Sequence, residues 1–208
     1  MLLSTAYFPP VEYFALLARY SVVYIEACEN YSKQSWRNRC RILTAGGPMD
    51  LIVPTVHAGD GSKLPIKQVR IEYTTPWVMR TRRAIASAYS SAPYFAHYSD
   101  GLFAILESRP ETLWELNMSL TRYFCNKLGL SVDIRETGSY IAPEEAASDD
   151  FRYSLHPKKV NTVLADRGLD RPYWQVFRER YGFTEGLSIM DLLFNEGPES
   201  MDWLRGSQ

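Results

Sequence analysis

The stretch from residue 111 to residue 127 constrains the fold more than any other part of the chain. Its apolar side chains recur every three or four residues, at Leu113, Leu116, Leu120, Phe124 and Leu128. This spacing puts one apolar stripe along a helix, and such a stripe must be buried against another part of the protein. Gly129 follows directly, as is common where a helix ends. The sequence therefore predicts a long amphipathic helix with one face in a hydrophobic core.

Short β-forming runs and helical patterns alternate along the rest of the chain. The expected strands are residues 2–6, 21–27, 39–44, 49–56, 69–73 and 132–136, with a four-residue turn at 45–48 closing a β-hairpin. The expected helices are residues 12–20, 77–91, 93–107, 173–180 and, last in the chain, 187–194. Residues 57–63 and 143–150 are expected to be exposed loops. We therefore predict an α/β fold: one domain over residues 1–208, with a mixed sheet flanked by helices, more strands in the N-terminal third and more helices in the C-terminal two thirds.

Composition and charge exclude several classes of partner. The chain has 23 basic and 24 acidic residues and a net charge of −1, so the whole molecule has no general attraction for nucleic acid. No apolar run approaches the roughly 20 residues that span a bilayer, which predicts no membrane insertion. Cys28, Cys40 and Cys125 have no metal-ligand spacing and cannot all pair, and the start of the chain lacks a secretory signal pattern. A reducing, cytoplasmic location is the expectation.

Familiar catalytic motifs are missing from the sequence. It has no Gly-rich phosphate loop with a Lys-Ser/Thr ending, no dinucleotide fingerprint, no nucleophile elbow, and no His-x-x-x-His or Cys-x-x-Cys pair. These absences disfavour ATP hydrolysis, hydride transfer and zinc chemistry. We expect no metal site, and the sequence names no cofactor.

Residues 33–41, which we call the basic segment, contain four cations, one Trp and no acid. If the segment is extended, Lys33, Arg37, Arg39 and Arg41 share one face, and a helix would also align Lys33, Arg37 and Arg41. Either conformation predicts a small anionic ligand, because guanidinium groups bind phosphate and carboxylate well. The alternative is a basic edge strand that only keeps the protein soluble.

A second group of cations lies on the helix expected from residue 77. Arg80 and Arg83 share a face of that helix. If this face meets the basic segment, the two groups would clamp a phosphate or carboxylate. The alternative is that they pair with acids such as Glu26, Glu29 or Glu72 in a structural network.

Candidates for acid–base chemistry are few. Glu26 and Glu29 could act as base and orienting group beside the basic segment, although charge balance is the commoner role of such residues. His57, His97 and His156 have a side chain that titrates near neutral pH, and none has a nucleophile motif next to it. We take Glu26, Glu29 and His57 as the catalytic candidates.

Three blocks of the sequence resemble a known family. Tyr7-Phe8-Pro9-Pro10 followed by Tyr13-Phe14 is similar to its N-terminal Pro-aromatic motif, although the Gln that often precedes the Pro is absent. The stretch from Glu29 to Ile42, which contains the basic segment, resembles its central signature, and residues 187–195 resemble its C-terminal block. The family is the WbqC-like family, whose members occur mainly in bacterial surface-polysaccharide and O-antigen gene clusters.

The resemblance implies a cytoplasmic role in making or modifying sugar precursors of surface glycans. Joined to the basic segment, it predicts a transferase that acts on an activated or nucleotide-linked amino sugar. The alternative is a non-catalytic binding or scaffold protein of the same pathway that docks an acidic partner. The expected ligand-binding residues are Tyr7, Pro9, Tyr13, Lys33, Trp36, Arg37, Asn38, Arg39, Arg41, Arg80 and Arg83. The oligomeric state is not predicted.

Overall fold

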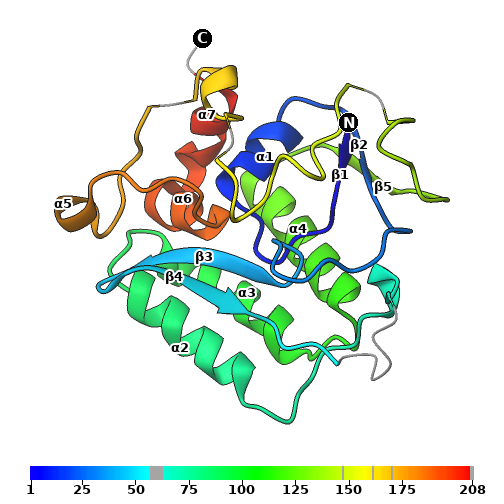
Figure 1. The fold of residues 1–208 in the computed structure, drawn as a ribbon. Helices are drawn as coiled ribbons and strands as arrows, with labels where there is room; N and C mark the ends of the chain where they lie inside the picture. The colour runs from blue at the N-terminus through cyan, green and yellow to red at the C-terminus, as the bar shows by residue number, and fades with distance from the viewer. Residues whose placement is uncertain (57–62, 147, 161, 170, 207–208) are drawn as a thin grey trace.

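Two separate β-structures organise the molecule (Figure 1). The computed structural model describes residues 1–56, 63–146, 148–160, 162–169 and 171–206. The first β-structure is a parallel sheet in the order β1-β2-β5, formed by β1 (Leu2–Leu3), β2 (Val22–Ile25) and β5 (Asp133–Glu136). The second is an antiparallel hairpin of β3 (Arg39–Thr44) and β4 (Gly47–Ile52). The β-residues thus come mainly from the first quarter of the chain.

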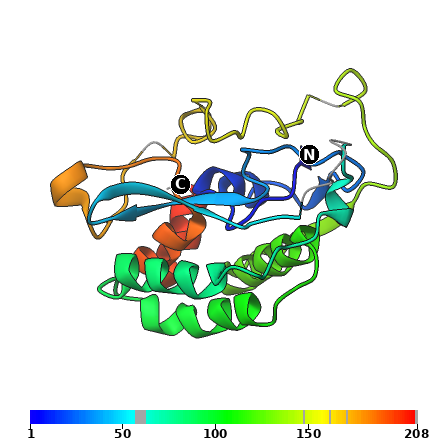
Figure 2. The ribbon, with the colours of Figure 1, turned by 60° about the horizontal axis from the view of Figure 1, so that its bottom comes forward.

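Helices form most of the remaining ordered structure. They are α1 (Val11–Leu17), α2 (Trp77–Tyr89), α3 (Phe95–Glu107), α4 (Leu113–Leu128), α5 (Arg178–Tyr181), α6 (Ile189–Glu196) and α7 (Ser200–Arg205). Figure 2 shows α2 and α3 on one side of the hairpin and the irregular segment after β5, in yellow, on the other. The prediction of an α/β fold with strands early and helices late is confirmed.

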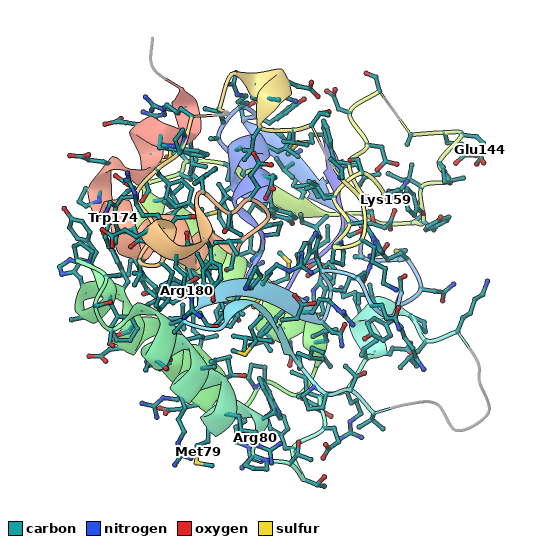
Figure 3. All side chains as sticks on the ribbon, turned by 60° about the vertical axis from the view of Figure 1, so that its left-hand side comes forward. Met79, Arg80, Glu144, Lys159, Trp174 and Arg180 are labelled. Carbon is teal, nitrogen blue, oxygen red and sulfur yellow. The ribbon has the colours of Figure 1, made fainter. Side chains whose placement is uncertain are left out.

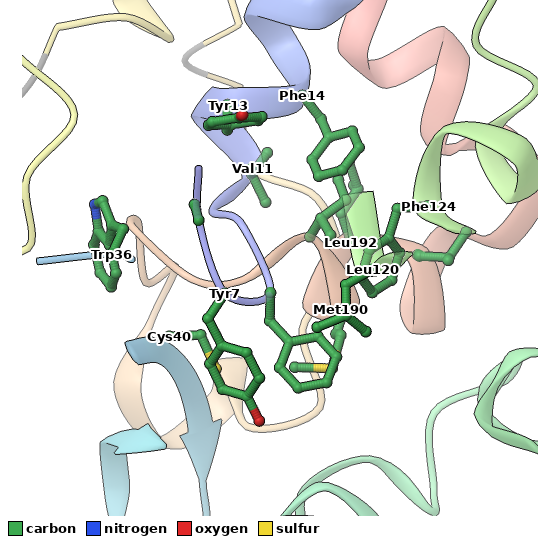
Figure 4. Packing of buried hydrophobic residues seen from close by; sticks show 14 of the residues in the cluster. Tyr7, Val11, Tyr13, Phe14, Trp36, Cys40, Leu120, Phe124, Met190 and Leu192 are labelled. Atoms are coloured by element: carbon green, nitrogen blue, oxygen red, sulfur yellow. The ribbon is translucent and has the colours of Figure 1, made fainter. Parts of the chain in front are cut away.

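Helix α4 packs into the centre of the core, as its periodicity predicts. Its first turn is closed by a capping box, in which the Glu115 amide donates to Thr112 Oγ1 at 3.2 Å and the Thr112 amide donates to Glu115 Oε2 at 3.2 Å. Gly129 ends it in the left-handed region, with φ 68°. Figure 4 shows Phe124 of α4 beside Phe14 of α1, with ring centroids 5.9 Å apart. The predicted helix is confirmed.

The structure corrects four of the predicted elements. Residues 69–73 make only single bridges, Arg70 to Thr112 and Ile71 to Thr55. Pro54 and Pro110 lie in the neighbouring segments and have no N–H to donate, which prevents a continuous ladder. The hairpin turn has two residues instead of four, because Thr44 already pairs with Gly47.

The other two corrections lie near the C-terminus. Residues 173–177 are not helical: the Trp174 amide donates to Glu196 Oε1 at 2.9 Å, and the Gln175 side chain bonds Thr184 instead of the solvent. The helix from Ile189 is not the last one, because α7 follows it.

Part of residues 143–150 also behaves differently from the prediction. Residues 143–145 form an exposed turn, as expected. Beyond the turn, however, the chain pairs with β1: the Leu2 amide donates to the Asp149 carbonyl and the Phe151 amide donates to the Leu2 carbonyl, both at 2.9 Å. This pairing places residues 149–151 alongside β1, at the edge of the parallel sheet.

The described residues contain neither a membrane-spanning helix nor a metal-binding cluster. None of the helices there is long and apolar enough to cross a membrane. No group of three or more His, Cys, Asp and Glu side chains in this part of the chain is arranged to hold a metal ion.

Candidate anion-binding site

A buried polar network joins the carboxyl ends of β2 and β5. Glu26, directly after β2, is fully buried and accepts four hydrogen bonds: from the Cys28 amide (2.9 Å), Thr137 Oγ1 (2.6 Å), the Ile141 amide (3.1 Å) and Arg152 Nη1 (3.0 Å). Arg152 also bonds Asp150, with Nη2 2.7 Å from Oδ2. Burial acts to raise the pKa of Asp150, but the hydrogen bonds and charge of Arg152 outweigh it and lower that pKa. The carboxylate of Glu26 therefore has a structural role: its hydrogen bonds link the end of β2 to the segments that follow β5.

A second buried ion pair lies beside the end of β1. Arg37 binds Glu29 through two bonds, Nε to Oε1 at 2.7 Å and Nη2 to Oε2 at 2.5 Å, and its Nη2 also donates to Ser4 Oγ at 2.6 Å. Both charged side chains are less than a tenth exposed. Asn117 of α4 donates to the Arg37 carbonyl at 2.8 Å. Arg37 therefore connects β1, the turn before β3 and the core helix.

The basic segment is neither a continuous strand nor a helix. Residues 33–38 form turns, and β3 begins only at Arg39. Trp36 is fixed in these turns because its carbonyl accepts the Tyr7 amide at 2.8 Å. The shared face is consequently limited to Arg39 and Arg41, which both contact Asp50, at 3.5 Å and 2.9 Å.

An open cavity of about 330 Å³ lies next to Trp36 and Arg41. Its other side is formed by residues 156–160, which follow the stretch that pairs with β1. It is lined by Pro10, Glu12, Trp36, Arg41, His156, Pro157, Lys158, Lys159, Val160, Glu185 and Gly186. Three cations and one histidine thus surround a space of the size that holds a small ligand.

The two lysines of this cavity contact neutral groups. Lys158 Nζ contacts Gln34 Oε1, and Lys159 Nζ donates to the Tyr153 carbonyl at 3.1 Å. Among the described residues, neither lysine has a carboxylate within ion-pair distance. Their charge is therefore available to an anion in the cavity.

His156 has a defined orientation and a perturbed acidity. Its Nδ1 accepts the Lys158 backbone N–H at 3.2 Å. Partial burial lowers its pKa below the usual 6.5, and the positive charges of Lys159, Lys158, Arg37 and Arg39 lower it further. The direction of this shift follows from partial burial and from the cations that surround the ring.

Trp36 separates the cavity from the buried ion pairs. It lines the open cavity on one side and, on the other, a small chamber of about 10 Å³ that Ser4, Thr5, Tyr13, Arg37 and Arg152 also line. This chamber has room for about one water molecule. Figure 4 shows Trp36 at the edge of the hydrophobic cluster, apart from Tyr13 and Phe14. The Arg41 guanidinium lies 5.8 Å from the centroid of the Trp36 ring.

The residues predicted from the sequence fall into four groups. Trp36 and Arg41 line the cavity. Glu26, Glu29 and Arg37 belong to the buried ion pairs, and Tyr7, Pro9, Tyr13 and Asn38 are also buried. Lys33 is exposed in the turn, Arg39 contacts Asp50, and Arg80 and Arg83 are exposed on α2 outside the cavity lining. His57 lies outside the described residues.

The prediction omitted Lys158, Lys159 and Arg152. Lys158 and Lys159 follow His156 and Pro157 directly, so a cluster of three basic or titratable side chains is visible in the sequence. Its distance along the chain from the basic segment hides their proximity. Arg152 gives no such signal, since a single Arg beside two Asp residues reads as a solvated charge cluster.

The chain is similar to a known protein family and to a curated relative. The model of the WbqC-like protein family matches residues 5–161. A curated relative, "Uncharacterized protein Rv1507c" of Mycobacterium tuberculosis, is 30% identical over 224 residues, covering 98% of this chain and 96% of the relative. No solved structure matches the chain. The matched range contains every lining residue of the cavity except Glu185 and Gly186.

Proposed function

We propose that this chain, which belongs to the WbqC-like protein family, binds a small phosphate-bearing ligand in the cavity beside Trp36 and transfers a group to or from it. The substrate class is an activated or nucleotide-linked sugar, including amino sugars. We infer the sugar part of the ligand from the resemblance to a family found in surface-polysaccharide gene clusters. We infer its phosphate group from the charged side chains that line the cavity.

The observation that carries the proposal is the convergence of Arg41, Lys158 and Lys159 on one cavity. Phosphate is bound well by such groups because each donates a charge-assisted hydrogen bond. Glu12 and Glu185 line the same cavity and Arg41 is paired with Asp50, so the two lysines are the lining cations without a carboxylate at ion-pair distance among the described residues. A concave basic site supports a ligand-binding enzyme over the docking protein, which would need a broad, flat contact surface.

The remaining lining residues suit the other parts of such a ligand. Trp36 offers an aromatic side chain for packing against a sugar or a base. Glu12 and Glu185 are the carboxylates placed to take a proton from an acceptor group. The sequence assigned that role to Glu26 and Glu29, but both carboxylates are buried and accept hydrogen bonds from buried arginines, which occupy their oxygens.

A thermal-shift screen tests the proposal. The purified protein would be heated with millimolar nucleotide sugars, nucleoside diphosphates, acyl donors and uncharged sugars. A ligand that binds only the folded state raises Tm. We expect a rise with phosphate-bearing compounds and none with the uncharged sugars. A flat response to every phosphate-bearing compound would contradict the proposal and favour the docking protein, to be sought next by pull-down with acidic partners.

A further inference from the structure

We propose that His156 binds the ligand as a neutral hydrogen-bond donor through Nε2 and stays uncharged at neutral pH. This inference rests on the proposed function, because it assigns a role within the same cavity. The ligand group it would meet is an acceptor oxygen, such as a phosphoryl, carbonyl or hydroxyl oxygen.

The first argument is the hydrogen bond at the other ring nitrogen. Nδ1 of His156 accepts the backbone N–H of Lys158 at 3.2 Å. A ring nitrogen that accepts a hydrogen bond carries no proton, so the proton of the neutral imidazole must be on Nε2. Protonation of Nδ1 would set two N–H groups against each other. Since His156 lines the cavity, Nε2–H is the donor that the ring can offer to a ligand.

The second argument is the charge around the ring. Lys158 and Lys159 come from its own segment, Arg37 and Arg39 from the turns and strand opposite, and Arg41 also lines the cavity. The acids of the cavity are Glu12 and Glu185, which act in the other direction. Burial and the four cations prevail, and the pKa of His156 is lowered. A second proton would add charge where positive charge is already concentrated.

A neutral imidazole contributes a directed hydrogen bond to a ligand, whereas a charged imidazolium would also add a positive charge. The lysines and Arg41 supply the attraction for phosphate, and His156 adds a directed N–H bond without taking up a proton. Such a donor can stabilise negative charge that develops on an oxygen during transfer. The lysines would therefore provide affinity, and His156 would orient the reacting oxygen.

The protonation state can be measured on the free protein. The chain has three histidines, so 15N-histidine NMR of the wild type and of His156→Gln assigns the signals of His156 by their loss. We expect the Nε2–H tautomer at pH 7 and a titration midpoint below the usual 6.5. An Nδ1–H tautomer, or an imidazolium at pH 7, would overturn the inference.

A pair of variants tests the role in binding, with inorganic pyrophosphate as the probe. The amide nitrogen of Gln can occupy the place of Nε2, whereas that of Asn reaches only the place of Nδ1. We expect His156→Gln to keep most of the affinity and His156→Asn to lose roughly ten- to hundredfold, the effect of one hydrogen bond to a charged group. Because pyrophosphate itself titrates near neutral pH, calorimetry in buffers of different ionisation enthalpy should show the same net proton exchange on binding for the wild type and for His156→Gln.

The outcomes separate this inference from the proposed function. Equal affinity of the two variants, or a net proton uptake greater in the wild type than in His156→Gln, would overturn the neutral-donor role while leaving the anion site in place. Failure of the wild-type protein to bind pyrophosphate or any phosphate-bearing compound would instead overturn the proposed function, and the ligand role of His156 with it. The NMR measurement still decides the state of the ring in that case.

Discussion

Arg37 and Lys158 carry the same charge but have different surroundings. Arg37 is 6% exposed and its guanidinium is occupied by Glu29 and Ser4. Lys158 is exposed, and its ammonium group contacts the neutral side chain of Gln34. Removing one partner of a buried ion pair typically costs about 3–5 kcal/mol, because the other charge stays buried alone. Ligand binding should therefore be probed at Lys158, since a change at Arg37 would first disturb the fold.

Asp191 is a buried acid that the proposed site does not use. It is 1% exposed, and its Oδ2 accepts hydrogen bonds from Tyr173 Oη at 2.8 Å and Gln175 Nε2 at 3.0 Å. Both partners are neutral. Burial raises the pKa of Asp191 to about 6, although these hydrogen bonds oppose the shift.

This raised pKa predicts how stability depends on pH. Below about pH 4 the carboxyl is protonated in the folded and unfolded states alike, so it causes no loss of stability. Between about pH 4 and pH 6 only the unfolded state releases the proton, and the free energy of unfolding falls by about 3 kcal/mol. Above pH 6 the loss is complete and constant.

Urea unfolding of the wild type and Asp191→Asn at pH 3 to 8 measures this effect. The variant cannot titrate at residue 191, whereas every other group is shared. We expect the stability of the wild type to decline relative to the variant between about pH 4 and pH 6. A difference that stays constant over this range would show that the pKa of Asp191 is not raised in the folded protein.

At the scale of elements, the end of α6 depends on a glycine for two reasons. Gly197 follows α6 with φ +52°, and a Cβ built there would lie 2.5 Å from the Tyr94 ring. The Tyr94 amide also donates to the Phe194 carbonyl at 3.0 Å, so the start of α3 packs directly on this turn. A side chain at residue 197 would separate α3 from α6.

Gly197→Ala can be compared with Gly182→Ala as a control with a similar backbone. Gly182 has φ +69° and ψ −164°, against +52° and −124° for Gly197, but a Cβ at residue 182 would meet no atom within 4 Å. Both variants should lose about 1–3 kcal/mol from a backbone conformation that only Gly adopts readily. Gly197→Ala should lose about 1–3 kcal/mol more from overpacking against Tyr94. Equal losses in denaturant unfolding would contradict the close packing of α3 on α6.

Local sequence patterns predicted the elements whose hydrogen bonds form within one stretch of the chain. They failed where contacts between distant residues determine the conformation. Helix α4 was predicted because its apolar stripe, cap and terminal glycine all lie within one stretch. Residues 69–73 have β-forming side chains, yet prolines in the adjacent segments prevent a ladder. The pairing of Asp149 and Phe151 with Leu2 joins distant parts of the chain, which no local pattern indicates.

The candidate site shows the same division. Trp36 and Arg41 were predicted from the composition of the basic segment, and both line the cavity. The pairing of Arg37 with Glu29 could not be read from the sequence, because eight residues separate them and the turns that bring them together follow no simple period. Lys158 and Lys159 line the cavity after the chain beyond β5 has returned to pair with β1, a contact between distant parts of the sequence.

At the scale of the whole molecule, the net charge does not reveal how the basic side chains are distributed. The chain as a whole carries −1, yet three cations face one cavity. Arg80 and Arg83 supply a natural comparison, since they are exposed cations on α2. Figure 3 shows Arg80 and Lys159 on well-separated parts of the molecule. A pair of neutralising changes at either place alters the net charge equally, from −1 to −3.

The measurement that tests the central claim most directly is the affinity of a nucleoside diphosphate for these two double variants, by titration calorimetry at fixed salt. We expect Lys158→Gln with Lys159→Gln to weaken binding about tenfold or more, because two charge-assisted bonds are lost. Arg80→Gln with Arg83→Gln should leave the affinity unchanged, and both variants should keep the wild-type Tm. Equal weakening in the two, or none in the first, would contradict an anion site between Trp36 and residues 156–160.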